Sequence, residues 1–346
     1  MALKIGVGLF TGQIPEGSNR TFEREYRDYL DLVQLAEAEG LDSAWVSEHH
    51  GAGDGYLPSL LPMLASFAAV TQRIELGTGV VLAPFHDPLR MAEDLAVVDQ
   101  ISGGRLIAGF GIGWREEEFR MWSIDISSRV RRLTEMVEIL RLAWTMDRFS
   151  YRGSHYSYEQ VSITPKPARV PPIFVGGFVE DAVRRAGRLG DGYLSSRADP
   201  QRVAAMFQLA AEERSKAGHP GPMMAGILQN AWVTENPEAD RAMVREGIGH
   251  QLGVYAGWRD GTDTPGRPLV VKPPDDDDID RTTAYGTPEQ VIGYLTPIVR
   301  ALTPYPQSHL ILRLHYPGMS VEPAAEATRL LAREVAPALR QLHAGG

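Results

Sequence analysis

The chain has 346 residues, 43% of them hydrophobic, with a net charge of −9 and no cysteine. The negative charge argues against nucleic acid as a partner, and the lack of thiols excludes disulfides, thiolate metal sites and a cysteine nucleophile. No apolar run approaches the roughly 18 residues of a membrane span, and the N-terminus lacks a secretory signal pattern, so we expect a cytoplasmic protein that acts on a small molecule.

Short apolar runs alternate eight times with segments of helical period. The predicted strands are 4–10, 43–47, 74–82, 105–110, 173–176, 192–195, a segment within 225–233, and 309–314. The predicted helices are 26–36, 58–70, one opening at Pro88, 129–144, 180–189, 202–216 and 323–342. Crossover helices require parallel strands. Eight units favour a single-domain (β/α)8 TIM barrel over 1–346, although an open doubly wound sheet satisfies the same alternation.

Two stretches interrupt the alternation and are predicted to be insertions after strands four and seven. Residues 146–171 indicate a small hairpin or loop, and 257–281, rich in Gly, Pro and Asp, indicate a mobile loop. The acidic run 275–278 lacks the spaced ligands and the glycine turn of a calcium loop. We interpret it as solvated loop and predict no metal site.

The second predicted strand ends in Ser47, Glu48, His49 and His50. Imidazole and carboxylate groups are common metal ligands, but adjacent residues on a strand point to opposite faces, so His49 and His50 should not converge. A histidine at a strand end in a pocket suits proton transfer. The alternative is a pair of structural histidines.

Two glycine-rich turns follow later strands. The run 109–114, GFGIGW, does not have the spacing of a dinucleotide-binding fingerprint. Its glycines either let the backbone approach a flat ligand or serve close packing of the protein itself. Gly176 and Gly177 directly precede a predicted helix, whose exposed amides attract anions. This turn predicts a phosphorylated ligand, or it is a turn required by the backbone conformation alone.

Together these segments resemble the bacterial luciferase-like flavin-dependent monooxygenase family from the first strand to the last helix. The resemblance is carried by SEHH at 47–50, by ELGTGVVLAPFHDPLRMAEDLAVVDQISGGRL at 75–106 and by YGTPEQVIGYL at 285–295. It implies that His49 acts on the flavin and that Glu48 lies at the cofactor. It also implies a cis peptide between Gly79 and Val80 behind the flavin ring.

The resemblance also places the cofactor phosphate. It implies contacts from Val175, Gly176, Gly177 and Phe178, with Arg129 or Arg131 supplying positive charge. This chain departs from the family pattern where relatives place a hydroxyl and a further arginine near the phosphate, because it has Phe178 and Ile112 there. Phosphate binding would then depend on backbone amides and Arg129.

The activity implied by the resemblance is a two-component monooxygenase. It would take reduced FMN from a separate flavin reductase and use molecular oxygen to oxygenate a small organic substrate, with His49 managing protons and 257–281 closing the mouth as a lid. GIGWREEEF at 111–119 resembles a loop of members that use the deazaflavin coenzyme F-420. The alternatives are therefore an F-420-dependent dehydrogenase or reductase, and a non-catalytic flavin-binding subunit.

Two further expectations concern surfaces. The family resemblance implies a homodimer formed through the second and third helices. Tyr56, Trp114, Trp232 and Trp258 either line an apolar substrate pocket at the mouth or belong to ordinary packing.

Overall fold

The computed structural model describes residues 3–196, 200–260, 277 and 281–345. Eight parallel strands form a closed ring: β1 (Lys4–Phe10), β2 (Ser43–Val46), β3 (Glu75–Thr78), β5 (Leu106–Gly111), β8 (Ile173–Gly176), β9 (Gly192–Ser195), β10 (Met224–Val233) and β12 (Ser308–Arg313). Closure comes from parallel pairing of β9 with β10 and of β12 with β1. The short strands β4 (Val81–Leu82) and β11 (Thr283–Gly286) extend this sheet beside β5 and β10. The chain is therefore a (β/α)8 TIM barrel, and an open sheet is excluded.

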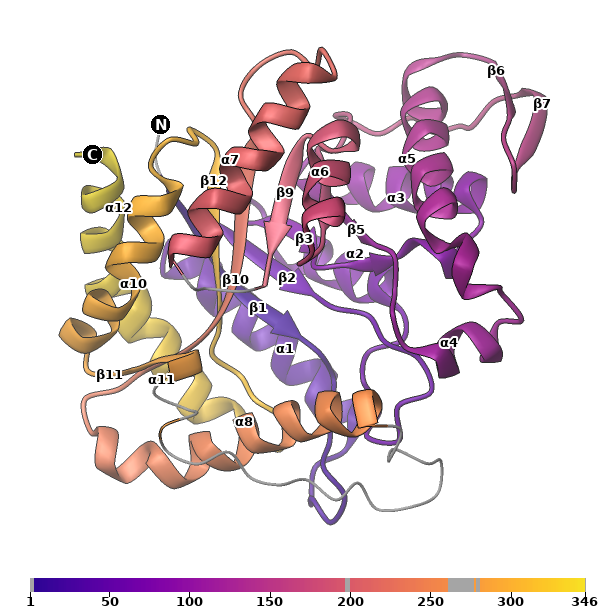
Figure 1. The fold of residues 1–346 in the computed structure, drawn as a ribbon. Coiled ribbons are helices and arrows are strands. Elements are labelled where there is room, and N and C mark those ends of the chain that lie inside the picture. Colours follow the sequence, from indigo (N-terminus) through magenta and orange to yellow (C-terminus); the bar gives the residue numbers. More distant parts are fainter. Residues whose placement is uncertain (1–2, 197–199, 261–276, 278–280, 346) are drawn as a thin grey trace.

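Helices surround the barrel on the outside (Figure 1). They are α1 (Phe22–Ala38), α2 (Leu60–Val70), α3 (Pro88–Ser102), α5 (Arg129–Thr145), α6 (Glu180–Leu189), α7 (Pro200–Lys216), α10 (Pro288–Leu302), α11 (Val321–Leu330) and α12 (Ala336–Ala344). The helix α3 shows how local sequence determines where a helix begins and ends. The Asp87 side chain accepts hydrogen bonds from the amides of Leu89 and Arg90, and Gly103 ends the helix in the left-handed conformation at φ 69°.

Two helices lie among the loops that follow the strands, at the end of the barrel where chemistry is expected. They are α4 (Glu116–Met121), after β5, and the long α8 (Pro237–Asp260), after β10. In Figure 1, α8 runs along the lower edge of the barrel, with its C-terminal end directed toward the loops next to α4. Neither helix is predicted from the sequence.

The barrel interior is filled by side chains. Trp45, Ile107, Phe174, Leu194 and Ile311 form a buried cluster there. A Cβ added at Gly77 would lie 2.3 Å from the ring of Trp45, so this glycine makes room for the indole. Because side chains fill the interior, we expect a cofactor at the mouth, where barrels of this kind place their active sites.

The two predicted insertions have different outcomes. Between α5 and β8 the chain forms an antiparallel hairpin of β6 (Phe149–Arg152) and β7 (Ser157–Val161), which confirms the hairpin expected within 146–171. The predicted loop 257–281 is wrong at its start, because residues 257–260 are the last turn of α8. Residues 261–276 and 278–280, which include most of the acidic run, lie outside the described residues.

The predicted third strand, 74–82, is broken where the Gly79–Val80 peptide is cis, as the family resemblance implies. A second cis peptide, Gly8–Leu9, was not predicted. Among the described residues, no helix has both the length and the apolarity needed to cross a membrane.

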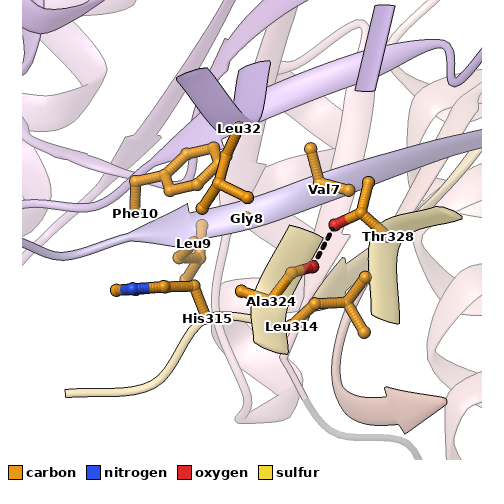
Figure 2. A pocket seen from close by; sticks show the side chains of 9 residues that line it. All are labelled: Val7, Gly8, Leu9, Phe10, Leu32, Leu314, His315, Ala324 and Thr328. Atoms are coloured by element: carbon orange, nitrogen blue, oxygen red, sulfur yellow. Dashed lines mark hydrogen bonds between the residues drawn. The ribbon is translucent and has the colours of Figure 1, made fainter. Parts of the chain in front are cut away.

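A small cavity of about 10 Å³ lies beside β1 (Figure 2). Val7, Leu32, Leu314 and Ala324 are among its lining residues, and the Thr328 hydroxyl beside it donates a hydrogen bond of 2.7 Å to the Ala324 carbonyl. This volume is about that of one water molecule. The cavity is therefore a packing void and not a cofactor site.

Candidate active site

His49 follows β2 and lies against a buried carboxylate from a distant part of the chain. Its Nδ1 is 2.9 Å from Oε1 of Glu118 in α4, and the same oxygen accepts a 2.9 Å hydrogen bond from the backbone N–H of His50. Glu118 is fully buried and His49 is 5% exposed. The described residues make no hydrogen bond to Nε2 of His49. The pair is thus an imidazole with one nitrogen anchored and the other available.

His50 binds a different carboxylate. Its Nε2 lies 2.6 Å from Oε1 of Glu48, and Nε2 of His86 lies 2.8 Å from the same oxygen. The other oxygen of Glu48 accepts a 2.8 Å hydrogen bond from the Leu82 amide in β4. Burial raises the pKa of Glu48, but the hydrogen bonds from His50 and His86 outweigh it and lower that pKa to about 2. For His86 burial lowers the pKa, and the contact with Glu48 raises it above its usual value.

The expectation that His49 and His50 do not converge is confirmed, but the sequence reasoning missed His86. The ligand atoms of Glu48, His50 and His86 lie within 4.8 Å of one another, a grouping that could hold a metal ion. Two ligands bound at about 2.1 Å to one ion would stand roughly 3.3 Å apart. Both imidazoles lie closer than that to one oxygen, so the contacts have the geometry of hydrogen bonds.

Aromatic rings cover His49. The ring centroids of Trp258, Tyr56, Tyr255 and Trp114 lie 4.6, 4.8, 5.6 and 6.4 Å from that of His49. Trp258 and Tyr255 come from α8, which reaches across the mouth from β10. Trp114, Tyr56 and Trp258, three of the aromatics singled out in the sequence, thus lie together around His49. The remaining predicted aromatic, Trp232, packs against Tyr316 and donates a hydrogen bond to Asp240.

The glycines on neighbouring strands make room for protein groups. A Cβ at Gly111 would lie 2.6 Å from Cγ2 of Val80, and one at Gly109 would lie 2.0 Å from the carbonyl oxygen of Thr78. A Cβ at Gly176 would lie 3.2 Å from Cγ1 of Val80. Val80 therefore sits between β5 and β8. For Gly109 and Gly111, close packing is the interpretation that the structure supports.

The turn before α6 has a similar explanation. A Cβ at Gly177 would lie 2.4 Å from that of Ala182, so packing within the turn already requires glycine there. Val175 is buried at the end of β8, and Phe178 is 42% exposed. The first turn of α6 carries Glu180 and Asp181, whose charges oppose an anion at this end of the helix. The glycines alone do not make a phosphate site.

Two arginines, one at the start of α5 and one in α6, carry donors that the glycines lack. The buried Nε atoms of Arg129, at the start of α5, and of Arg185, in α6, have no hydrogen-bond partner among the described residues. Burial lowers the pKa of Arg185, and the charges of Arg188 and Arg129 lower it further. Buried guanidinium groups with unused donors are stabilised by an anion with several acceptor oxygens. The residues present fit the phosphate of a flavin cofactor.

Arg131 does not share this position, because its charge acts on Tyr151 in the hairpin. Of the two arginines that the sequence offered, Arg129 is therefore the one beside Arg185. Sequence reasoning missed Arg185, Glu118 and Tyr255. The charged face of VEDAVRRAGRLG and the helical spacing of Val244, Ile248 and Leu252 are the signals that could have identified α6 and α8 as contributors.

Comparisons with known proteins show which family and which enzymes the chain is similar to. The family model described as luciferase-like monooxygenase matches residues 3–302. The F-420-dependent glucose-6-phosphate dehydrogenase of Microbacterium testaceum is 29% identical over 66% of this chain and 70% of its own length. Limonene 1,2-monooxygenase of Rhodococcus erythropolis is 27% identical over 89% of this chain and 80% of its own. For two further F-420-dependent relatives of the same name, the match spans 53% and 50% of their length.

The fold recurs in a solved structure. The oxygenating constituent of 3,6-diketocamphane monooxygenase from Pseudomonas putida, solved with FMN, superposes with a TM-score of 0.76. It is 19% identical, with 97% of this chain and 99% of that chain covered.

Proposed function

Because the chain belongs to the luciferase-like monooxygenase family, we propose that it is a monooxygenase that uses reduced FMN and molecular oxygen to oxygenate a small organic substrate. The observation that carries this proposal is the environment of His49. Its imidazole is anchored at Nδ1, carries no protein hydrogen bond at Nε2 among the described residues, and is enclosed by four aromatic rings. Oxygen chemistry on a reduced flavin requires such exclusion of water.

The residues divide into three tasks. Arg129 and Arg185 hold the cofactor phosphate next to Val175, Gly176, Gly177 and Phe178. The Gly79–Val80 bulge supports the flavin ring, which when bound supplies the redox chemistry. His49 holds or moves a proton at Nε2, and Glu48 fixes the end of β2 to β4 through the Leu82 amide.

Reduced FMN comes from a separate reductase, which contacts the oxygenase transiently in the cytoplasm. The chain works as one domain over 1–346 and forms a homodimer through α2 and α3. Val97 and Ile101 support that interface, since they are 45% and 49% exposed on α3.

The test is oxygen uptake with FMN, a generic flavin reductase and a panel of organic substrates, with isotopically labelled oxygen traced into the product. Substrate-dependent incorporation of label supports the proposal. The proposal is wrong if the protein binds deazaflavin tightly, leaves reduced FMN unbound and transfers hydride without taking up oxygen.

A second candidate, an F-420-dependent dehydrogenase, is favoured by the relatives of that name. It would use the same His49 as the base that accepts a hydroxyl proton while hydride leaves the substrate carbon. Reduction of deazaflavin by a sugar phosphate or an alcohol, followed by its absorbance, separates the two. The third reading, a non-catalytic flavin-binding subunit, is excluded if His49→Ala abolishes turnover without weakening flavin binding.

A further inference from the structure

We propose that Glu118 is a positioning residue that fixes the proton of neutral His49 on Nδ1 and thereby leaves Nε2 as the atom that accepts protons at the site. This inference rests on the proposed role of His49. Glu118 lies 69 positions along the chain from His49, and its carboxylate reaches His49 because α4 folds back over the loop after β2.

The direction of the hydrogen bonds follows from the backbone. The amide of His50 can only donate, so Oε1 of Glu118 is an acceptor at 2.9 Å. A carboxylate oxygen has a second lone pair, which faces Nδ1 of His49 at 2.9 Å. A neutral imidazole carries one proton. With that proton on Nδ1, Nε2 holds a free lone pair.

The loop that carries both histidines is held from two sides by the same segment. Glu118 binds the N–H of His50, and Nη1 of Arg115 donates a 2.7 Å hydrogen bond to the carbonyl oxygen of His50. The backbone N–H of His49 donates to the Leu57 carbonyl at 3.3 Å. The histidine backbone is therefore fixed, and only the direction of its ring is left for Glu118 to determine.

Glu118 also stays in contact with His49 when both ring nitrogens carry a proton. When Nε2 takes up a proton, the imidazolium keeps Nδ1–H directed at a fully buried carboxylate. The second oxygen of Glu118 has no hydrogen-bond partner among the described residues, so there the His50 amide is the one other donor to this carboxylate.

The same guanidinium connects this arrangement to the aromatic cover. The guanidinium carbon of Arg115 lies 4.6 Å from the ring centroid of Trp258 in α8. Arg115 and Glu118 are three residues apart along the chain. The segment that orients His49 is thus also the one on which the covering helix rests.

The experiment measures the tautomer of His49 directly. Long-range ¹H–¹⁵N NMR of the purified chain, at a pH where the ring is neutral, distinguishes a protonated Nδ1 from a protonated Nε2. We expect Nδ1–H in the unsubstituted chain and a mixed or Nε2–H tautomer in Glu118→Ala. Glu118→Gln, which retains an acceptor oxygen, should keep Nδ1–H and serves as the conservative variant if the alanine variant does not fold.

Kinetics give the second readout. We expect kcat to fall at least about tenfold in Glu118→Ala, and less in Glu118→Gln, while KM stays within about twofold. Glu116→Gln is the matched control, since Glu116 is exposed on the same helix. The inference is overturned if neutral His49 carries its proton on Nε2 in the unsubstituted chain, or if Glu118→Ala changes neither the tautomer nor kcat. If no substrate turns over, the proposed function fails, and the tautomer measurement still decides the role of Glu118.

Discussion

His49 and His50 are adjacent in the chain, yet each imidazole contacts its own buried carboxylate. Nδ1 of His49 lies 2.9 Å from Glu118, and Nε2 of His50 lies 2.6 Å from Glu48. The first contact leaves Nε2 of His49 without a hydrogen bond from the described residues. The second belongs to a group with His86 that connects β2 to the loop before α3. In the proposed function His49 handles the proton, while His50 has a structural role through Glu48.

The different roles of His49 and His50 predict different effects of their alanine variants. His49→Ala should abolish turnover with flavin affinity unchanged, because the proton-handling group is lost. His50→Ala should lower the free energy of unfolding by about 1–3 kcal/mol, because it removes a hydrogen-bond partner from buried Glu48. Urea unfolding and flavin titration of both variants provide the check. Turnover that persists in His49→Ala would contradict these roles.

The unpaired Nε atoms of Arg129 and Arg185, among the described residues, predict how the cofactor phosphate is bound. Arg129→Ala and Arg185→Ala should each weaken FMN binding by about 10- to 100-fold, since a charge-assisted hydrogen bond contributes about 1.5–3 kcal/mol. Riboflavin lacks the phosphate, so its affinity should not change. Fluorescence titration with both flavins measures this, and Arg188→Ala, exposed on the same helix as Arg185, is the control. A similar loss for riboflavin would show that the arginines act on the fold.

The position of Trp258 over His49 predicts how tightly oxygen consumption is coupled to product formation. Trp258→Ala removes a ring that lies 4.6 Å from His49 and should admit water to the site. We expect more hydrogen peroxide and less product per flavin oxidised, with a loss of about 3 kcal/mol in stability for a buried Trp. Trp258→Phe should retain most of the coupling. Hydrogen peroxide and product are measured together for each variant. Unchanged coupling in Trp258→Ala would show that Trp258 does not exclude water from the site.

The Glu48 and His86 contact predicts a pH dependence of stability. The pKa of His86 is raised on folding, so its contribution is complete below its unfolded value of 6.5 and is lost as pH rises through the folded value. The pKa of Glu48 is lowered to about 2, so its contribution is complete above its unfolded value of 4.5 and is lost as pH falls toward 2. The pair should stabilise the fold most between those two unfolded values.

His86→Asn isolates this effect. The difference in unfolding free energy between His86→Asn and the unsubstituted chain should be larger at about pH 5.5 than at about pH 8.5. Urea titrations at the two pH values measure it. A difference that is constant, or that grows with pH, would contradict the assignment.

The exposed face of α3 predicts the oligomeric state. Val97→Asp combined with Ile101→Asp should convert a homodimer to monomers without unfolding the barrel, because charge on a buried interface is costly. Val130→Asp, at a comparably exposed apolar position on α5, is the control. Light scattering at micromolar concentration reads the mass, and a monomeric unsubstituted chain would refute the dimer.

The sequence by itself determined the repeating unit. Strands 173–176 and 192–195 and helix 180–189 have the bounds that alternation, glycine turns and helical period predict, because these signals depend on near neighbours in the chain. The same local reasoning singled out His49 and Gly177 as candidates, whereas the cis peptide between Gly79 and Val80 was implied by the family resemblance. It could not distinguish a closed barrel from an open sheet, since that depends on β9 pairing with β10.

Only the tertiary structure decided how the site is assembled. Glu118 meets His49 across 69 positions, Tyr255 meets Tyr56 across 199, and Arg185 meets Arg129 from a different helix. Val244, Ile248 and Leu252 have the spacing of a helix, but no local signal shows that the last turns of α8 reach His49. Contacts of this kind depend on how each strand twists and where each loop folds back. Local sequence determines the elements, and packing between distant elements determines which side chains meet.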